Sequence, residues 1–297
     1  MYQQSPIIER LWREEAANLG QSGPVIDLGI RSDQLYVAVK LEMEFLRPDA
    51  SPLIVQGTGF VVVDIRRSLA VVVTSRHLLD PAFRPPGTNR KAQLGLRLHE
   101  VRGKAWRRSG TGLERFVWRI ESPRAMYHLD DHLDVGLLDL NDLKVESGSN
   151  TLEFYVPRDL LSPRSDFDGS IISAADMVAV IGYPEINGDA TDSPLLIPGI
   201  LSSDPRISAP LPGLPTDIVA YHAFSRSGMS GAPVVAPTRG LKVTGDISIE
   251  SADWRGVRIV GVNSGHLRRD SNDPMPLSYF CPSWAVLEIL DQVAFGQ

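Results

Sequence analysis

Hydrophobic side chains recur with the period of β-strands along most of this chain. Over residues 37–44, apolar positions alternate with polar or small ones, as in a strand with one buried face. Two apolar runs follow at 59–63 and 70–74, and the polar turn at 64–68 lies between them. This pattern predicts a hairpin of two buried strands.

Further short runs with strand character continue along the chain, and loops that carry Pro and Gly separate them. These runs are Leu94–Leu98, Phe116–Ile120, Val135–Leu140, Met177–Ile181, Ile218–Tyr221, Ala232–Val235 and Arg258–Val262. Many short strands joined by such loops are typical of all-β barrels and sandwiches. We therefore expect an all-β fold.

Helical periodicity is found at the two ends. Apolar residues within Ile8–Leu19 recur every three or four positions with charges between them, and Gly20 ends the segment, which predicts an amphipathic helix. Pro282–Leu290 regains this spacing and predicts a helix that closes the fold. The segment Asp142–Ser173 is the expected crossover between two halves of the strand region.

The composition fits one large globular domain. The chain has 297 residues, of which 43% are hydrophobic and 22% are charged, and its net charge is -6. This acidic balance argues against an electrostatic nucleic-acid binder. We expect the short basic stretch Arg102–Arg108 to be a solvated loop.

Cysteine usage and the N-terminal residues bear on location. Cys281 is the only cysteine, so no disulfide forms within the chain. Residues 1–20 lack the apolar core of a signal peptide, and no stretch reaches the ~18 apolar residues needed to span a bilayer. We expect a cytoplasmic protein that binds no membrane.

Three short motifs carry the members of a possible Ser-His-Asp triad. His77 follows the second strand of the predicted hairpin, Asp134 directly precedes the apolar run 135–138, and Ser230 lies in the turn Gly228–Pro233. In such a triad the acid orients an imidazole, which takes a proton from a hydroxyl that attacks a carbonyl. The order His, Asp, Ser is that of the chymotrypsin barrels.

The predicted roles follow from the residue types. Ser230 is the candidate nucleophile, His77 the general base and Asp134 the orienting acid. Gly228 and Gly231 allow a turn that directs amides inward, so we expect the N–H groups of Gly228 and Ser230 to form the oxyanion hole.

A metal site is the competing interpretation of the second motif. Potential ligands crowd this segment, namely His128, Asp130, Asp131, His132 and Asp134. The segment lacks cysteine and a His-Glu-x-x-His motif, so we expect neither metal nor cofactor. Sensitivity to chelators would favour a metal-dependent hydrolase.

Together the motifs resemble those of bacterial trypsin-like serine peptidases of the chymotrypsin fold, nearer the HtrA-like branch that lacks disulfides. The matching segments, in the family's order, are Gly57–Phe60, Val73–His77, Asp134–Leu138, Ile181–Pro184, Ser227–Val235 and Gly261–Gly265. The resemblance covers about residues 35–292. It implies two six-stranded β-barrels and the hydrolysis of protein or peptide substrates.

One departure from the family lies beside the serine. Digestive members have an aspartate there, which pairs with a newly cleaved N-terminus and shapes the oxyanion loop, whereas this chain has Met229. We expect no zymogen activation of that kind, and a loop over Ser225–Ser230 that stays open or misformed until a regulatory partner or substrate engages it. No PDZ-like domain is expected after Gly265, because only a short segment follows it.

The resemblance also implies a substrate site. Its expected residues are Phe224, Asn263, Ser264 and Gly265. Phe224 should lie near the base of the primary pocket, and an aromatic base without a carboxylate favours a small or medium apolar side chain over Arg or Lys. His222 and His266 leave a preference for an acidic side chain open.

These observations give one functional hypothesis and two alternatives. The hypothesis is a serine endopeptidase that works through an acyl-enzyme intermediate. The alternatives are a catalytically silent binding module of the same fold and a metal-dependent hydrolase. The expected organisation is a helical extension at 1–34 and a peptidase domain at 35–297, with an N-barrel at about 35–145 and a C-barrel at about 174–297.

Overall fold

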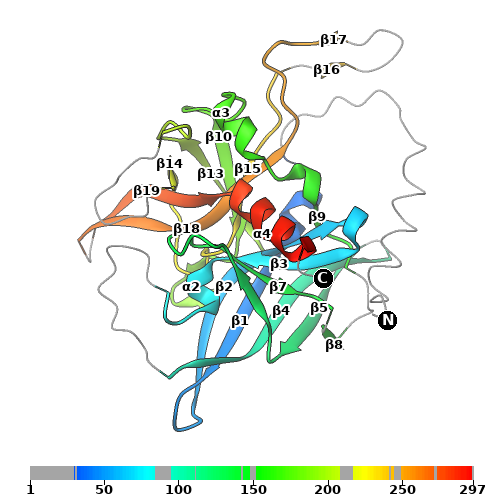
Figure 1. Cartoon of the computed structure of the whole chain (residues 1–297), viewed down its shortest axis with the longest axis vertical. Coiled ribbons are helices and arrows are strands. Elements are labelled where there is room, and N and C mark those ends of the chain that lie inside the picture. Colours follow the sequence, from blue (N-terminus) through cyan, green and yellow to red (C-terminus); the bar gives the residue numbers. More distant parts are fainter. Residues whose placement is uncertain are drawn as a thin grey trace.

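Strands dominate the computed structural model of the protein and form two lobes (Figure 1). The structure describes residues 30, 32–83, 95–110, 112–141, 143–147, 152–207, 217–240, 242–243, 249–270 and 273–295. The helix expected over Ile8–Leu19 lies outside these residues.

The first lobe is one nine-stranded sheet, which follows the 3-10 helix η1 (Ser32–Val37). Its strands are β1 (Ala38–Leu46), β2 (Pro52–Asp64), β3 (Leu69–Thr74), β4 (Arg97–Ser109), β5 (Gly112–Glu121), β6 (Ala125–Tyr127), β7 (Gly136–Asp139), β8 (Lys144–Ser147) and β9 (Val156–Pro157). They lie in the order β6-β7-β3-β2-β1-β4-β5-β8, and β9 pairs with β2. Two short helices, η2 (Ile65–Arg67) and α2 (Arg76–Leu79), precede and follow β3.

The second lobe is a closed barrel with the strand order β10-β13-β14-β19-β18-β15. Its strands are β10 (Met177–Gly182), β13 (Leu195–Leu201), β14 (Val219–His222), β15 (Pro233–Ala236), β18 (Arg258–Asp270) and β19 (Asp273–Pro282). Two small hairpins accompany it, β11 (Glu185–Ile186) with β12 (Asp189–Ala190) and β16 (Lys242–Val243) with β17 (Ile249–Glu250). The helices η3 (Arg158–Leu160) and α3 (Arg164–Asp168) precede the barrel, and α4 (Ser283–Phe295) follows it. This is the all-β, two-lobed architecture of the chymotrypsin fold, as expected.

The two apolar runs of the first lobe form the predicted hairpin. β2 and β3 pair antiparallel, with Phe60 opposite Val73. Phe60 and Val62 pack into one hydrophobic cluster, whereas Val61 and Val63 pack into another on the opposite face. Because both faces of the hairpin are covered, its sequence is continuously apolar rather than alternating.

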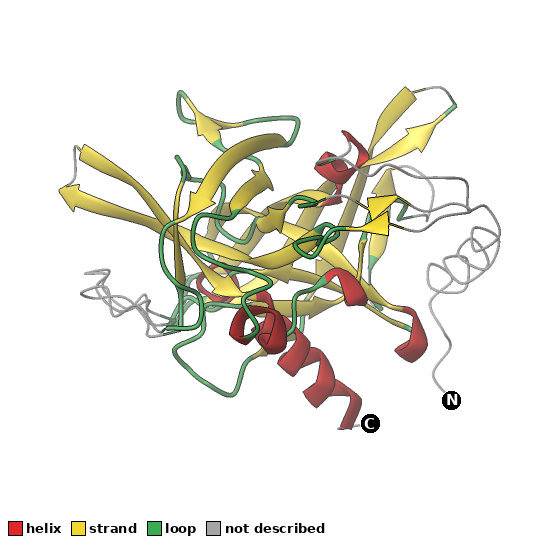
Figure 2. Cartoon of the chain, turned by 90° about the horizontal axis from the view of Figure 1, so that it is seen from above, coloured by secondary structure: helices red, strands yellow, loops and turns green. Residues whose placement is uncertain are grey.

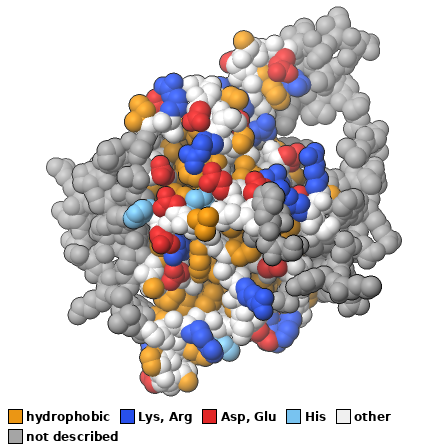
Figure 3. All heavy atoms as spheres, viewed as in Figure 1, with side chains coloured by type: hydrophobic (Ala, Val, Ile, Leu, Met, Phe, Trp, Pro, Cys, Tyr) orange, Lys and Arg blue, Asp and Glu red, His pale blue; other side chains and the backbone are white. Residues whose placement is uncertain are grey.

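The prediction for the basic stretch Arg102–Arg108 is wrong. This stretch lies in β4, where Lys104 pairs with Glu42 at 2.7 Å and Arg102 pairs with Glu146 at 3.3 Å. Glu42 lies on the neighbouring strand β1, whereas Glu146 lies on β8, beyond β5. Opposite charges across a sheet stabilise it, so a charged sequence forms a strand here. Figure 3 shows positive and negative side chains intermixed on one face of the molecule.

A shared core joins the two lobes. One hydrophobic cluster contains Phe60 and Val73 of the first lobe, Val180 and Val262 of the barrel, and Ile289 of α4. Seen from above, α4 runs along one side of the strands (Figure 2).

Among the described helices, none has the length and apolar character needed to cross a membrane.

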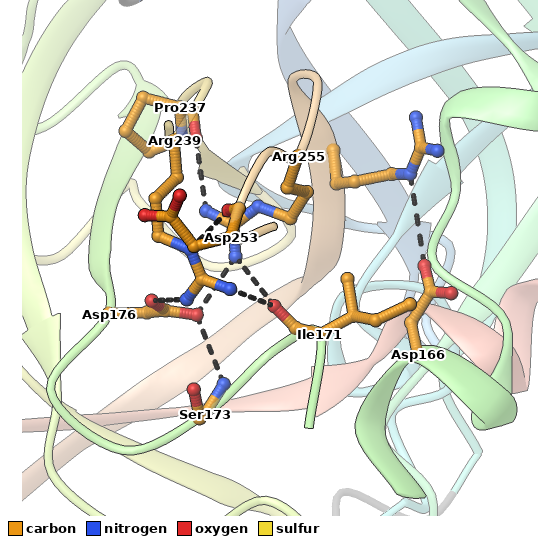
Figure 4. A network of polar contacts seen from close by, with 9 residues as sticks. Asp166, Ile171, Ser173, Asp176, Pro237, Arg239, Asp253 and Arg255 are labelled. Carbon is orange, nitrogen blue, oxygen red and sulfur yellow. Dashed lines mark hydrogen bonds and ion pairs between the residues drawn. The ribbon is translucent and has the colours of Figure 1, made fainter. Parts of the chain in front are cut away.

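A buried ion cluster fixes the segment that enters the barrel (Figure 4). The carboxylate of Asp176 accepts hydrogen bonds from Arg239 at 2.6 Å and from Arg255 at 2.8 Å. Arg255 also donates to the carbonyls of Ile171 and Pro237. Asp176 and Arg255 are both buried. The cluster therefore ties the start of β10 to the segments on either side of the β16–β17 hairpin.

Removing the carboxylate should be strongly destabilising. Asp176→Ala leaves Arg255 buried without a counter-charge, and we expect the free energy of unfolding to fall by about 3–5 kcal/mol in urea denaturation. The matched control is Asp204→Ala, which breaks an exposed pair with Arg206 and should hardly change stability. Equal stability of the two variants would contradict the structural role of the cluster.

Candidate active site

His77 and Asp134 form a closely bonded pair. His77 lies on α2, directly after the buried strand β3. Its Nδ1 lies 2.7 Å from Asp134 Oδ2, and its backbone N–H donates to Oδ1 at 2.9 Å. With Nδ1–H donating to the carboxylate, Nε2 of the neutral ring is an acceptor. The two residues thus have the geometry that a general base and its orienting acid require.

The structure holds Asp134 in a buried position. Its side chain is 3% exposed, whereas that of His77 is 17% exposed. Its neighbours Leu133 and Val135 belong to the shared core. Two donors from His77 compensate the buried charge. Burial, and then the charge of Asp134, raise the pKa of Tyr279 to about 12, so this phenol stays protonated.

Ser230 lies in a loop whose shape depends on two glycines. Gly228 and Gly231 have φ values of 86° and 85°, in the left-handed region. A Cβ at Gly228 would lie 2.4 Å from the Tyr183 carbonyl oxygen, and one at Gly231 would lie 2.1 Å from the Thr58 carbonyl oxygen. Glycine is therefore required at both positions.

The serine loop docks on the first lobe. The backbone N–H of Thr58 in β2 donates to the Ser230 carbonyl at 2.9 Å. The carbonyl of Asn263 accepts from the Gly231 N–H at 2.7 Å and from the Ser75 hydroxyl at 3.0 Å. Ser75 directly precedes α2, so one carbonyl links the serine loop to the helix that carries the histidine.

Every carbonyl from residue 226 to residue 230 accepts a hydrogen bond. The donors, in chain order of the carbonyls, are the amides of Met229 and Glu185, the hydroxyl of Thr58, the side-chain amide of Asn263 and the backbone amide of Thr58. By contrast, the amides of Gly228 and Ser230 have no acceptor within the described part of the chain. These are the two amides that the sequence predicts to form an oxyanion hole, and such a site requires donors that are not already bonded within the protein.

The serine loop is held by hydrogen bonds from Thr58, Glu185 and Asn263 rather than open or misformed, which differs from the expectation based on Met229. The Met229 side chain is fully buried in the shared core. Its burial, together with the bonded carbonyls on both sides, fixes the loop without an ion pair to an N-terminus.

The Ser230 hydroxyl and the His77 imidazole are not hydrogen-bonded. Ser230 is half-buried at the junction of the lobes, and no bond between its hydroxyl and the ring is found among the residues that the structure describes. Catalytic hydrogen bonds are often long in the absence of substrate and tighten when it binds. The described geometry therefore contains the His77–Asp134 pair but no bond from this pair to Ser230.

Asn263, predicted to bind substrate, supports the serine loop. Its side chain is fully buried. Its Nδ2 donates to the Met229 carbonyl at 2.8 Å and to the Ser225 hydroxyl at 2.9 Å, and its Oδ1 accepts from the Tyr221 hydroxyl at 2.7 Å. Burial raises the pKa of Tyr221, which keeps this donor protonated.

The other predicted substrate residues lie along one strand and at the surface. β18 pairs with β15 up to Val262, and among the described strands only β19 accompanies it through Ser264 and Gly265. At these two residues the other edge of β18 thus has no strand paired with it among those described, and Ser264 is 4% exposed. Phe224 is 58% exposed, and His222 is also exposed.

Three of the potential metal ligands before β7 are engaged with separate partners. His128 pairs with Glu288 at 2.8 Å, and Asp131 pairs with Arg76 at 3.2 Å. Asp134 bonds the imidazole of His77. Within the residues described, no group of three or more such side chains is suited to hold a metal ion.

Cys281 does not compete with Ser230 as a nucleophile. Its side chain is buried, and burial raises the pKa of its thiol well above the usual value. A thiol that stays protonated and inaccessible is a poor nucleophile.

Sequence reasoning assigned no role to Thr58, Tyr183 or Ser75, although all three lie in or beside the motifs. Each bonds to a segment distant in sequence. The sequence feature that could have pointed to Thr58 is its position between Gly57 and Gly59, directly before the apolar run 60–63.

Gly228 offers a test of the loop geometry. Gly228→Ala forces a Cβ against the Tyr183 carbonyl, so we expect the rate of reaction of Ser230 with a fluorophosphonate probe to fall about 100-fold, as when an oxyanion donor is lost. Gly188→Ala is the matched control, because Gly188 has a φ of 91° with no atom near its Cβ position. Equal rates in both variants would show that the close approach at Gly228 has no part in reactivity.

Neither models of protein families nor curated proteins match the sequence. Solved structures do. The MamO protease domain from Magnetospirillum magneticum is 14% identical, with a TM-score of 0.45, over 87% of this chain and 98% of that one. The active form of the Rv3671c protease from M. tuberculosis is 18% identical, with a TM-score of 0.42, over 88% and 82%. An inactive mutant form of Rv3671c is 16% identical, with a TM-score of 0.40, over 89% of each chain. At these values the matches say nothing about individual residues of the site.

Proposed function

We propose that the protein is a serine endopeptidase of the trypsin-like, HtrA-like branch. The observation that supports this most is the meeting of two arrangements at one seam. One is the His77–Asp134 pair at 2.7 Å, and the other is the Ser230 loop with its two free amides. A general base, a nucleophile and an oxyanion site are the parts that acyl transfer needs.

In the proposed reaction, Ser230 Oγ attacks the scissile carbonyl carbon while His77 Nε2 takes the hydroxyl proton. The carbonyl oxygen becomes an oxyanion and accepts hydrogen bonds from the amides of Gly228 and Ser230. Nε2–H then protonates the leaving nitrogen, the C–N bond breaks and an ester on Ser230 remains. Water, deprotonated by the same Nε2, then attacks this ester; the bond to Ser230 Oγ breaks, Nε2–H returns the proton to Oγ and the acid is released. Asp134 orients the imidazole and stabilises its cation.

The edge of β18 that no described strand pairs with supports a peptide substrate. An extended peptide can pair with the backbone at residues 264–265, beside the serine loop, as an added strand. The proposed side chain at the cleaved bond is small or medium and apolar, with Phe224 nearby. A regulatory partner and a cytoplasmic location stay predictions from the sequence.

A second candidate is a catalytically silent peptide-binding module of the same fold. The unbonded Ser230 hydroxyl among the described residues favours it. Such a module would bind peptide along β18 but would not react with a fluorophosphonate.

Ser230→Ala should abolish both covalent labelling by a fluorophosphonate and peptide cleavage while leaving the fold intact. Loss of the nucleophile removes about 10⁶ in rate in a serine protease, because the triad acts as a unit. Ser147→Ala, at an exposed position on β8, is the control and should label normally. Cleavage at the wild-type rate by Ser230→Ala would refute the mechanism.

Asp134→Asn should keep the geometry but favour the wrong tautomer of His77. We expect kcat to fall by about 10⁴, the size of this effect in a serine protease triad. The measurement is peptide hydrolysis in the presence and absence of a chelator. If the chelator removed activity and this substitution did not, a metal-dependent reaction would replace the one proposed.

A further inference from the structure

The hydroxyl of Thr58 joins the two lobes at the serine loop. Thr58 lies in β2 of the first lobe and is fully buried. Its Oγ1 donates to the Gly228 carbonyl at 2.7 Å and accepts the Tyr183 N–H at 3.1 Å. One side chain of the first lobe thus holds two peptide groups of the second, one in the serine loop and one just after β10.

The peptide planes on both sides of Gly228 are fixed by their carbonyls. The Gly228 carbonyl belongs to the plane shared with Met229, and Thr58 holds it. The Gly228 amide belongs to the plane shared with Ser227, whose carbonyl accepts the Glu185 N–H at 2.8 Å. Because C=O and N–H point in opposite directions across a trans peptide, the Gly228 amide points away from Glu185.

The first of these planes depends on Thr58 most directly. Glycine rotates freely about both backbone bonds, so the Gly228 residue itself does not restrain the plane. A buried carbonyl without a donor is unfavourable. Loss of the Thr58 hydroxyl would therefore let the Gly228–Met229 peptide turn, and the Met229 amide would turn with it. This peptide lies between the plane that carries the Gly228 amide and the plane that carries the Ser230 amide, so its movement would displace both of these amides.

We propose that Thr58 is a positioning residue for the oxyanion hole. Its hydroxyl holds the Gly228–Met229 peptide, which lies between the amides of Gly228 and Ser230, and so keeps both amides directed at the oxygen of the reacting group. This inference rests on the proposed serine peptidase function and adds a residue of the first lobe to its machinery.

The test compares two substitutions in the full chain. Thr58→Val keeps the shape of the side chain and removes the hydroxyl, whereas Thr58→Ser keeps the hydroxyl. The readout is the rate constant for reaction of Ser230 with a fluorophosphonate. We expect Thr58→Val to lower this rate constant about 10- to 100-fold, which approaches the effect of losing an oxyanion donor. Thr58→Ser should keep most of the wild-type rate constant. With a cleaved peptide, kcat should fall while KM changes little.

A matched control separates positioning from general stability. Ser283→Ala removes another buried hydroxyl, which donates to the Ser162 carbonyl at 2.8 Å near α4. We expect it to lower the melting temperature about as much as Thr58→Val does, without slowing the reaction. Hydrogen exchange of a peptide spanning residues 226–231 should become faster in Thr58→Val only.

The outcomes distinguish the two proposals. An unchanged rate in Thr58→Val, failure of Thr58→Ser to recover the rate, or equal slowing by Ser283→Ala would overturn the positioning role. If the wild-type chain did not label at all, the proposed function would fail instead. Hydrogen exchange would then test whether the Thr58 hydroxyl holds the serine loop. Unchanged exchange over residues 226–231 in Thr58→Val would overturn this role, and faster exchange would support it.

Discussion

The serine loop packs against the first lobe backbone to backbone, with no room for a side chain between them. A Cβ at Gly231 would lie 2.1 Å from both the Thr58 carbonyl oxygen and the Thr74 hydroxyl. This contact sets the distance between the lobes at the point where the proposed reaction brings His77 and Ser230 together. The rest of the site depends on it, because the two residues belong to separate sheets and this contact lies directly beside the serine.

The seam is polar, yet its groups are paired. The Thr74 hydroxyl donates to the Thr58 carbonyl at 2.7 Å, the Thr58 hydroxyl donates to Gly228, and Asn263 bonds both Met229 and Tyr221. Inside a hydrophobic core, such a network is rigid when every member is satisfied and costly when one is missing. It therefore makes one arrangement of the serine loop much more favourable than others, which is the condition for a preorganised oxyanion site.

The hydrophobic pattern predicted much of the fold, because buried strands such as 59–63 and 70–74 need continuous apolar runs wherever both faces are covered. It missed β13, which contains Pro198 and Gly199, and the part of β4 beyond Leu98, whose charges are paired only in three dimensions. The motif order similarly anticipated the pairing of His77 with Asp134, since each residue lies beside the end of a strand.

The support of the serine loop was beyond sequence reasoning for a different reason. Thr58 and Gly228 are 170 positions apart, and nothing local marks them as partners. The expectation of a misformed loop considered only the missing ion pair at Met229. It could not include the burial of that side chain or the capture of the neighbouring carbonyls, which arise only when the lobes come together.

A crystal structure of the full chain after reaction with a small fluorophosphonate tests the central claim most directly. The account predicts a phosphorus atom bonded to Ser230 Oγ and a phosphoryl oxygen at about 2.7–3.1 Å from the amide nitrogens of Gly228 and Ser230. It also predicts that the Thr58 hydroxyl stays bonded to the Gly228 carbonyl. A phosphoryl oxygen directed elsewhere, or a Gly228 amide turned away from it, would contradict a preformed oxyanion site.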